Sequence, residues 1–158
     1  MLKPVLLFAY GNISRGDDAL APLLLERIKH SEITQIVGHP VKFLTDYQMQ
    51  IEHVTDMSGC ERILLIDADK LITSAYSFYT VQAQLETSYT THGMTPSTLL
   101  HTFQQVYNKP APLTSMLAIA GSSFKLGQGL SKKAKNNLDQ AEIFLKKILF
   151  HNDFTLWD

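Results

Sequence analysis

Residues 5–10 (VLLFAY) form an uninterrupted apolar run that leads straight into a Gly11-Asn12 turn. A strand that is apolar on both faces is typical of a parallel sheet with helices on both sides. Residues 62–67 and 115–120 have the same character, and amphipathic stretches separate the three runs. The sequence therefore predicts a three-layer α/β/α fold around a mostly parallel, twisted sheet of about five strands.

Helix signals occur between these runs. Thr95 is a candidate N-cap with Pro96 at the first helical position, and Ser131 is a candidate cap for the last helix. Additional strands are expected at residues 35–37, 41–44 and 77–81, and Phe154 and Trp157 are candidates to dock on the core. The expected helix faces are, in chain order, Leu20, Leu23, Leu24 and Ile28; Tyr47, Ile51 and Val54; Leu99, Leu100, Phe103 and Val106; and Ala134, Leu138, Ala141, Leu145 and Ile148.

The composition fits a single cytoplasmic domain over residues 1–158. No segment approaches the roughly 18 consecutive apolar residues of a membrane span. The formal charge of −1 argues against nonspecific binding to nucleic acid, which requires a basic face. The single cysteine, Cys60, allows no internal disulfide and is expected to be a small buried hydrophobe.

Two acids, Asp17 and Asp18, follow the first turn at the expected start of a helix. Ligands of open α/β sheets bind at the carboxyl ends of the strands. A phosphate loop there would present backbone amides or a lysine, whereas two carboxylates suit a cation. The alternative is that Gly11-Asn12 is only a turn and that Asp17 or Asp18 only caps the helix.

A third acid and a histidine are expected near the same edge of the sheet. Asp67 closes a buried strand, and His92 lies in a loop before the Thr95-Pro96 helix start, while Asp69 is expected to be more exposed. Two carboxylates and an imidazole from three loops would form a metal site with open positions. The other histidines have no acidic partner that the sequence can place and are interpreted as surface residues: His30, His39, His53, His101 and His151.

Other catalytic schemes find little support. No serine lies in a Gly-x-Ser-x-Gly elbow, Cys60 has no evident base, and there is no His-Glu-x-x-His helix.

With these motifs, the chain resembles the endopeptidases that mature the large subunit of nickel–iron hydrogenases. The family's opening, Gly-Asn followed by an Asp and a second acid, is similar to residues 9–12 (AYGN) and 15–18 (RGDD). Its acid at the end of a central strand matches residues 64–68 (LLIDA), and its histidine motif matches residues 91–96 (THGMTP). The late glycine-rich turn matches residues 126–131 (LGQGLS). Departures from the pattern include Ala9, Ala19 and Ala21, where the family has glycines.

The resemblance implies a protease that removes the C-terminal extension of a hydrogenase large-subunit precursor after nickel insertion. By this carry-over, Asp18, Asp67 and His92 contact nickel supplied by the substrate, so no firmly resident cofactor is expected. Three ligands from loops should hold a free ion only weakly. A water polarised by the metal, or activated by Asp18 or Asp67 as a general base, would attack the peptide bond.

Two alternatives stay open at this stage. One is a metallohydrolase that keeps its own ion, such as zinc, and cleaves another amide. The other is a non-catalytic chaperone that binds the metal or the precursor, because one doubly wound fold hosts many activities.

Overall fold

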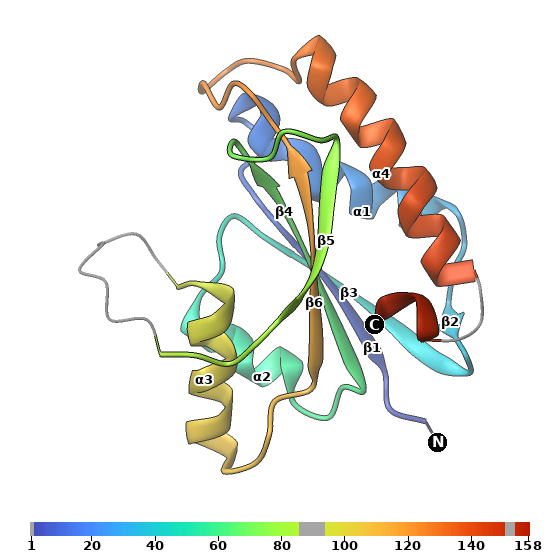
Figure 1. Cartoon of the computed structure of the whole chain (residues 1–158), viewed down its shortest axis with the longest axis vertical. Helices are drawn as coiled ribbons and strands as arrows, with labels where there is room; N and C mark the ends of the chain where they lie inside the picture. Colours follow the sequence, from blue (N-terminus) through green and yellow to red (C-terminus); the bar gives the residue numbers. More distant parts are fainter. Residues whose placement is uncertain (1, 86–93, 151–153) are drawn as a thin grey trace.

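A six-stranded sheet lies between two layers of helices in the computed structural model, which describes residues 2–85, 94–150 and 154–158 (Figure 1). The strands are β1 Val5–Tyr10, β2 Gln35–Ile36, β3 His39–Asp46, β4 Arg62–Asp69, β5 Tyr76–Val81 and β6 Leu113–Ala120. The helices are α1 Leu20–His30, α2 Val54–Met57, α3 Pro96–Tyr107 and α4 Lys132–Phe150, with short 3-10 turns η1 Gly16–Ala19, η2 Ile51–His53 and η3 Thr155–Trp157.

The strand order is β2-β3-β1-β4-β6-β5. The four central strands β3, β1, β4 and β6 are parallel, and the edge strands β2 and β5 are antiparallel to their neighbours. The three-layer α/β/α prediction is confirmed, and the sheet has six strands where about five were expected.

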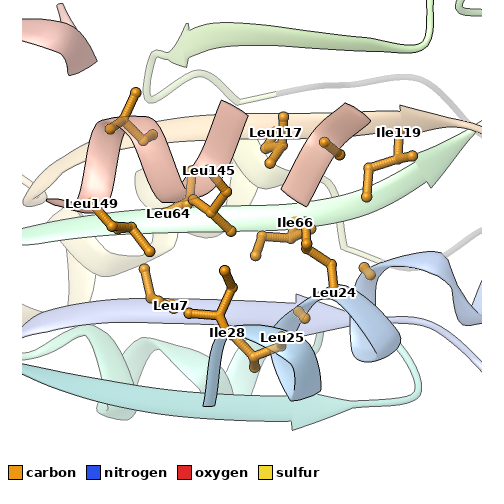
Figure 2. Packing of buried hydrophobic residues seen from close by; sticks show 14 of the residues in the cluster. Leu7, Leu24, Leu25, Ile28, Leu64, Ile66, Leu117, Ile119, Leu145 and Leu149 are labelled. Carbon is orange, nitrogen blue, oxygen red and sulfur yellow. The ribbon is translucent and has the colours of Figure 1, made fainter. Parts of the chain in front are cut away.

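Alternate residues of the central strands supply two separate cores. Leu7, Leu64 and Leu117 point to the face covered by α1 and α4, where Figure 2 shows them packed with Leu24 and Leu145. The opposite face is covered by α2 and α3. The intervening strand positions, among them Phe8, Leu65 and Met116, pack there with Phe103 of α3. All six residues of β1 are buried, which explains why its sequence is apolar throughout.

Both predicted caps are present. The Thr95 hydroxyl accepts a hydrogen bond from the Thr98 amide at 3.2 Å, and the Ser131 hydroxyl accepts one from the Ala134 amide at 3.1 Å. All five apolar positions expected in the last helix are buried. At the carboxyl end of the chain, the Trp157 side chain is 2% exposed and docks on the first core.

Some expected core positions are wrong. Leu23 and Val106 are 38% and 60% exposed because they lie at the margins of their helical stripes, and Leu25 is buried where Leu23 was expected. Tyr47 and Ile51 are also exposed, since the chain after β3 turns before η2 and α2 instead of forming one continuous helix. Within the described ranges, none of the helices has the length and apolar character needed to cross a membrane.

Candidate functional site

Asp17 is completely buried and ties two distant segments together. Its carboxylate accepts hydrogen bonds from the amides of Ser122, Ser123 and Ser131 at 2.8, 3.1 and 2.8 Å. The hydroxyls of Ser122 and Ser131 donate to it as well, at 3.2 and 2.8 Å. Burial raises the pKa of Asp17, but the three amides and the Ser131 hydroxyl outweigh it, so that the pKa lies below its usual value. Asp17 therefore anchors η1 to the loop between β6 and α4.

Asp18, the next residue, is only partly buried and faces the first turn. Its Oδ2 accepts a hydrogen bond from the Asn12 amide at 2.7 Å. A Cβ atom on Gly11 would lie 2.1 Å from the Asp18 carbonyl oxygen, so this close approach requires glycine. Neither η1 nor α1 has a side-chain cap, and the interpretation of Asp17 or Asp18 as a helix cap is therefore wrong.

Asp67 lies on β4, beside the end of β1. The parallel register pairs Ala9 with Ile66, which places Tyr10 next to Asp67. The Ala68 amide donates to Asp67 Oδ1 at 2.8 Å, and the neighbouring Tyr10 phenol lowers the pKa of this carboxyl group. Tyr10 is itself buried, and burial followed by the charge of Asp67 raises the pKa of its phenol well above the usual value.

The environment of Asp67 disfavours its charged form. Burial is the largest cause that raises its pKa, and the negative charges of Asp18 and Asp69 add to it. The Ala68 amide and Tyr10 lower the pKa, and the net result is a value of about 7. Asp18 is thus close enough to Asp67 to repel it electrostatically. A divalent cation placed between the two carboxylates would relieve this repulsion, and oxygen ligands of this type suit a hard or borderline metal.

The third predicted ligand, His92, lies outside the described residues. Across residues 2–85, 94–150 and 154–158, no group of three or more His, Cys, Asp or Glu side chains is arranged to hold a metal ion. The structure therefore brings together Asp18 and Asp67, and a role for these two residues and His92 in metal contact stays a prediction.

An acid–imidazole pair next to this edge was missed. His53 was expected at the surface, but it is 5% exposed, and its Nε2 lies 3.0 Å from Asp46 Oδ2. Because the Gln50 amide donates to His53 Nδ1 at 2.8 Å, the ring carries its proton on Nε2 and donates it to Asp46. The imidazole is then neutral, and Asp46 keeps a net negative charge. Asp46 pairs in register with Tyr10. At this edge of the sheet, Asp46 of β3, Tyr10 of β1 and Asp67 of β4 therefore occupy neighbouring positions on three adjacent strands.

The remaining titratable residues mostly match expectation. Cys60 is buried. Asp69 is partly buried rather than exposed, and its Oδ1 accepts a hydrogen bond from the Leu71 amide at 2.8 Å. Of the other histidines, His30 is exposed, His39 and His101 are partly exposed, and His151 lies outside the described residues.

A cleft of about 300 Å³ adjoins the Asp18 turn. Its walls are partly apolar, with Asp46 as its charged residue. The lining residues are Gly11, Ile13, Pro22, Thr45, Asp46 and Tyr47. A cleft of this kind can hold a ligand or a short segment of another chain.

The structure is similar to several solved hydrogenase maturation proteases. HycI from Thermococcus kodakarensis KOD1 matches with a TM-score of 0.70 and 18% identity over 93% of this chain and 92% of its own. HybD, the hydrogenase maturating endopeptidase of E. coli, matches with a TM-score of 0.69 and 14% identity over 92% and 91%. The endopeptidase HycI from Escherichia coli matches with a TM-score of 0.64 and 18% identity over 92% and 90%.

Neither a family model nor a curated protein matches the sequence. The structural matches nevertheless span nearly the whole of each chain, and they agree with the resemblance carried by the four sequence motifs. The chain has the fold of the nickel–iron hydrogenase maturation proteases.

Proposed function

We propose that this chain is a cytoplasmic endopeptidase that removes the C-terminal extension of a nickel–iron hydrogenase large-subunit precursor after nickel insertion. In this proposal Asp18, Asp67 and His92 contact the nickel that the precursor already carries. The metal serves as a mark of a correctly loaded substrate, and the protein keeps no ion of its own.

The convergence of Asp18 and Asp67 at the carboxyl edge of the sheet carries this proposal. The two carboxylates lie close enough for Asp18 to raise the pKa of Asp67, and a cation is the natural partner for such a pair. The shared fold with hydrogenase maturation proteases adds the substrate class. The hydrogen bonds of Asp17 support assigning the ligand role to Asp18. The donors around the Asp17 carboxylate occupy it, so it is not available to a ligand.

Hydrolysis then needs a water molecule and a group that accepts its proton. A carboxyl with a pKa of about 7 is a suitable general base near neutral pH, and Asp67 is such a group in the free protein. Substrate nickel polarises the water or the scissile carbonyl and lowers the energy of the developing negative charge. The adjoining cleft, which contains Asp46 and Ile13, would hold the peptide on one side of the scissile bond.

Incubation with purified precursor tests the proposal. The nickel-loaded and the nickel-free precursor are each mixed with the protein in a buffer without added metal, and the products are analysed by mass spectrometry. We expect the loaded precursor to be shortened at its C-terminus and the nickel-free precursor to stay intact. Asp67→Asn should abolish this cleavage, whereas Asp139→Asn, a charge-matched change on the exposed side of α4, should not.

Each alternative predicts a different result. A protein that binds the precursor without shortening it is a chaperone. A protein that contains a stoichiometric ion as purified, and cleaves both precursor forms, is a metallohydrolase with a resident metal. Either result would contradict the proposed function.

A further inference from the structure

The segment that carries Asp18 is held by a distant part of the chain. Its own helical turns, η1 and α1, have no side-chain caps. Three backbone hydrogen bonds instead join this segment to the loop between β6 and α4. They run from the Gly127 amide to the Ser14 carbonyl at 2.7 Å, from the Gly16 amide to the Gln128 carbonyl at 3.0 Å, and from the Asp17 amide to the Ser123 carbonyl at 2.8 Å.

Ser131 connects Asp17 to α4. The Ser131 amide donates to Asp17 Oδ1 at 2.8 Å, and the Ser131 hydroxyl donates to Asp17 Oδ2, also at 2.8 Å. The same hydroxyl accepts a hydrogen bond from the Ala134 amide in the first turn of α4, at 3.1 Å. Helix α4 packs on the first core through Leu138 and Leu145. Ser131 therefore ties both oxygens of the Asp17 carboxylate to the end of a packed helix.

A fixed Asp17 restricts where Asp18 can lie, because a single peptide bond joins the two residues. The Asp18 amide donates to the Arg15 carbonyl at 3.0 Å, and Asp18 Oδ2 accepts a hydrogen bond from the Asn12 amide at 2.7 Å. Both partners of Asp18 belong to its own turn, so these bonds do not fix the turn relative to the sheet. The hydrogen bond of the Asn12 amide reports on the position of the Asp18 carboxylate.

The loop that holds this turn begins at β6, the strand next to β4, which carries Asp67. It therefore relates the position of Asp18 to the part of the sheet where Asp67 lies. Groups that contact a metal or a reacting atom must be held firmly, and supports behind metal ligands typically change affinity or activity by about 10–100-fold when removed.

We propose that Ser131 is a positioning residue: through Asp17, its hydroxyl holds the Asp18 carboxylate in place relative to Asp67, where both contact the nickel of the substrate. The inference rests on the proposed function, in which Asp18 and Asp67 contact that nickel. Ser131 has no contact with the metal in this account and acts through Asp17 and the main chain.

The test compares Ser131→Ala with Thr114→Val, since both changes remove one hydroxyl. The Thr114 hydroxyl donates to the Pro112 carbonyl at 2.9 Å, at the start of β6 and away from the carboxyl edge. NMR measures the hydrogen-exchange rate of the Asn12 amide in each metal-free protein, and kcat/KM is measured with the nickel-loaded precursor. We expect Ser131→Ala to exchange the Asn12 amide at least about tenfold faster and to lose about tenfold in kcat/KM. Thr114→Val should match the wild type in both measurements.

Two further serine variants sharpen the test. Ser131→Thr keeps a hydroxyl at this position and should restore both values. Ser122→Ala removes a hydroxyl that donates to Asp17 Oδ2 at 3.2 Å, and it should shift both values in the same direction by a smaller factor. If Ser131→Ala does not fold, Ser122→Ala decides the question, and wild-type values for that variant overturn the inference.

A purely structural role gives a different pattern. In that case Ser131→Ala lowers Tm, as Thr114→Val does, but leaves Asn12 exchange and kcat/KM at the wild-type values, and this result overturns the inference. Faster exchange with an unchanged kcat/KM overturns it as well, because the position of Asp18 would then not matter to the reaction.

The outcome also separates the two proposals. If Asp67→Asn blocks processing while Ser131→Ala is silent in both measurements, the positioning role fails and the proposed function stands. If the wild type leaves the precursor intact, the proposed function fails, and the exchange rate of the Asn12 amide still decides whether Ser131 holds Asp18.

Discussion

Asp17 and Asp67 are two aspartates at the same edge of the sheet with opposite environments. Asp17 is enclosed by five hydrogen-bond donations from three serines, and its pKa is lowered. Asp67 accepts a hydrogen bond from the Ala68 amide, is repelled by Asp18 and Asp69, and has its pKa raised to about 7. The fold satisfies the first carboxylate and leaves the second in need of a positive partner. The difference separates a residue that stabilises the structure from one suited to bind a ligand.

The largest expected effect is on the fold, at Asp17. Replacing Asp17 by Ala removes the acceptor that the Ser122, Ser123 and Ser131 amides share in this part-buried loop and leaves a cavity at a completely buried position. We expect the free energy of unfolding to fall by about 3 kcal/mol or more, measured by urea denaturation at pH 7.5. The matched control Asp139→Ala, on the exposed face of α4, should stay within about 0.5 kcal/mol. Equal stability of the two variants would remove the contrast between Asp17 and Asp67.

The opposite sign is expected for Asp67→Asn. An asparagine keeps an oxygen for the Ala68 amide but carries no charge to be repelled by Asp18. At pH 8, where Asp67 is ionised in the folded protein, the metal-free variant should be more stable than the wild type by about 1–2 kcal/mol. Thermal unfolding in the presence of a chelator measures this difference. A destabilised Asp67→Asn protein would show that the Asp67 carboxylate is already satisfied.

The pH dependence of stability sharpens the same comparison. The pKa of Asp67 is about 7 in the folded protein and close to 4 when the chain is unfolded. Between these values the folded protein binds the extra proton, so Tm of the wild type should rise as the pH is lowered from about 8 to 5. Asp67→Asn should lack this rise. Asp17 acts the other way, because its lowered pKa contributes stability that is lost only under more acidic conditions.

The smallest effect is expected at His53. His53→Phe retains a ring against Phe8 but loses the hydrogen bonds with Asp46 and the Gln50 amide. We expect a loss of about 1 kcal/mol in the free energy of unfolding at pH 7.5. Urea denaturation beside His30→Phe, a change at an exposed position, provides the comparison. A loss equal to that of Asp17→Ala would make the Asp46–His53 pair as important to the fold as Asp17.

The sequence predicted the central strands, and it predicted that Asp18 and Asp67 follow the carboxyl ends of strands at one edge of the sheet. Strands β1, β4 and β6 were recognisable because a strand covered on both faces must be apolar throughout. The proximity of the two acids then follows from topology, since the carboxyl ends of parallel strands share one edge.

The parts that could not be predicted depend on tertiary contacts. The serines that hold Asp17 lie 105 to 114 positions away in the chain, so nothing local distinguishes Asp17 from Asp18. The pairing of His53 with Asp46 depends on the geometry of the turn between β3 and η2. Periodicity predicted a helix face there, and Tyr47 and Ile51 proved to be exposed.

Cleavage of the nickel-loaded precursor by Asp18→Asn tests the central claim most directly. Asparagine retains an oxygen for the Asn12 amide, so the fold should lose less than about 1 kcal/mol and Tm should stay near that of the wild type. The amide is a poor ligand for a divalent ion, so we predict a folded protein that leaves the precursor unprocessed. Full processing by folded Asp18→Asn would contradict the account, because the negative charge of Asp18 would then have no part in the reaction.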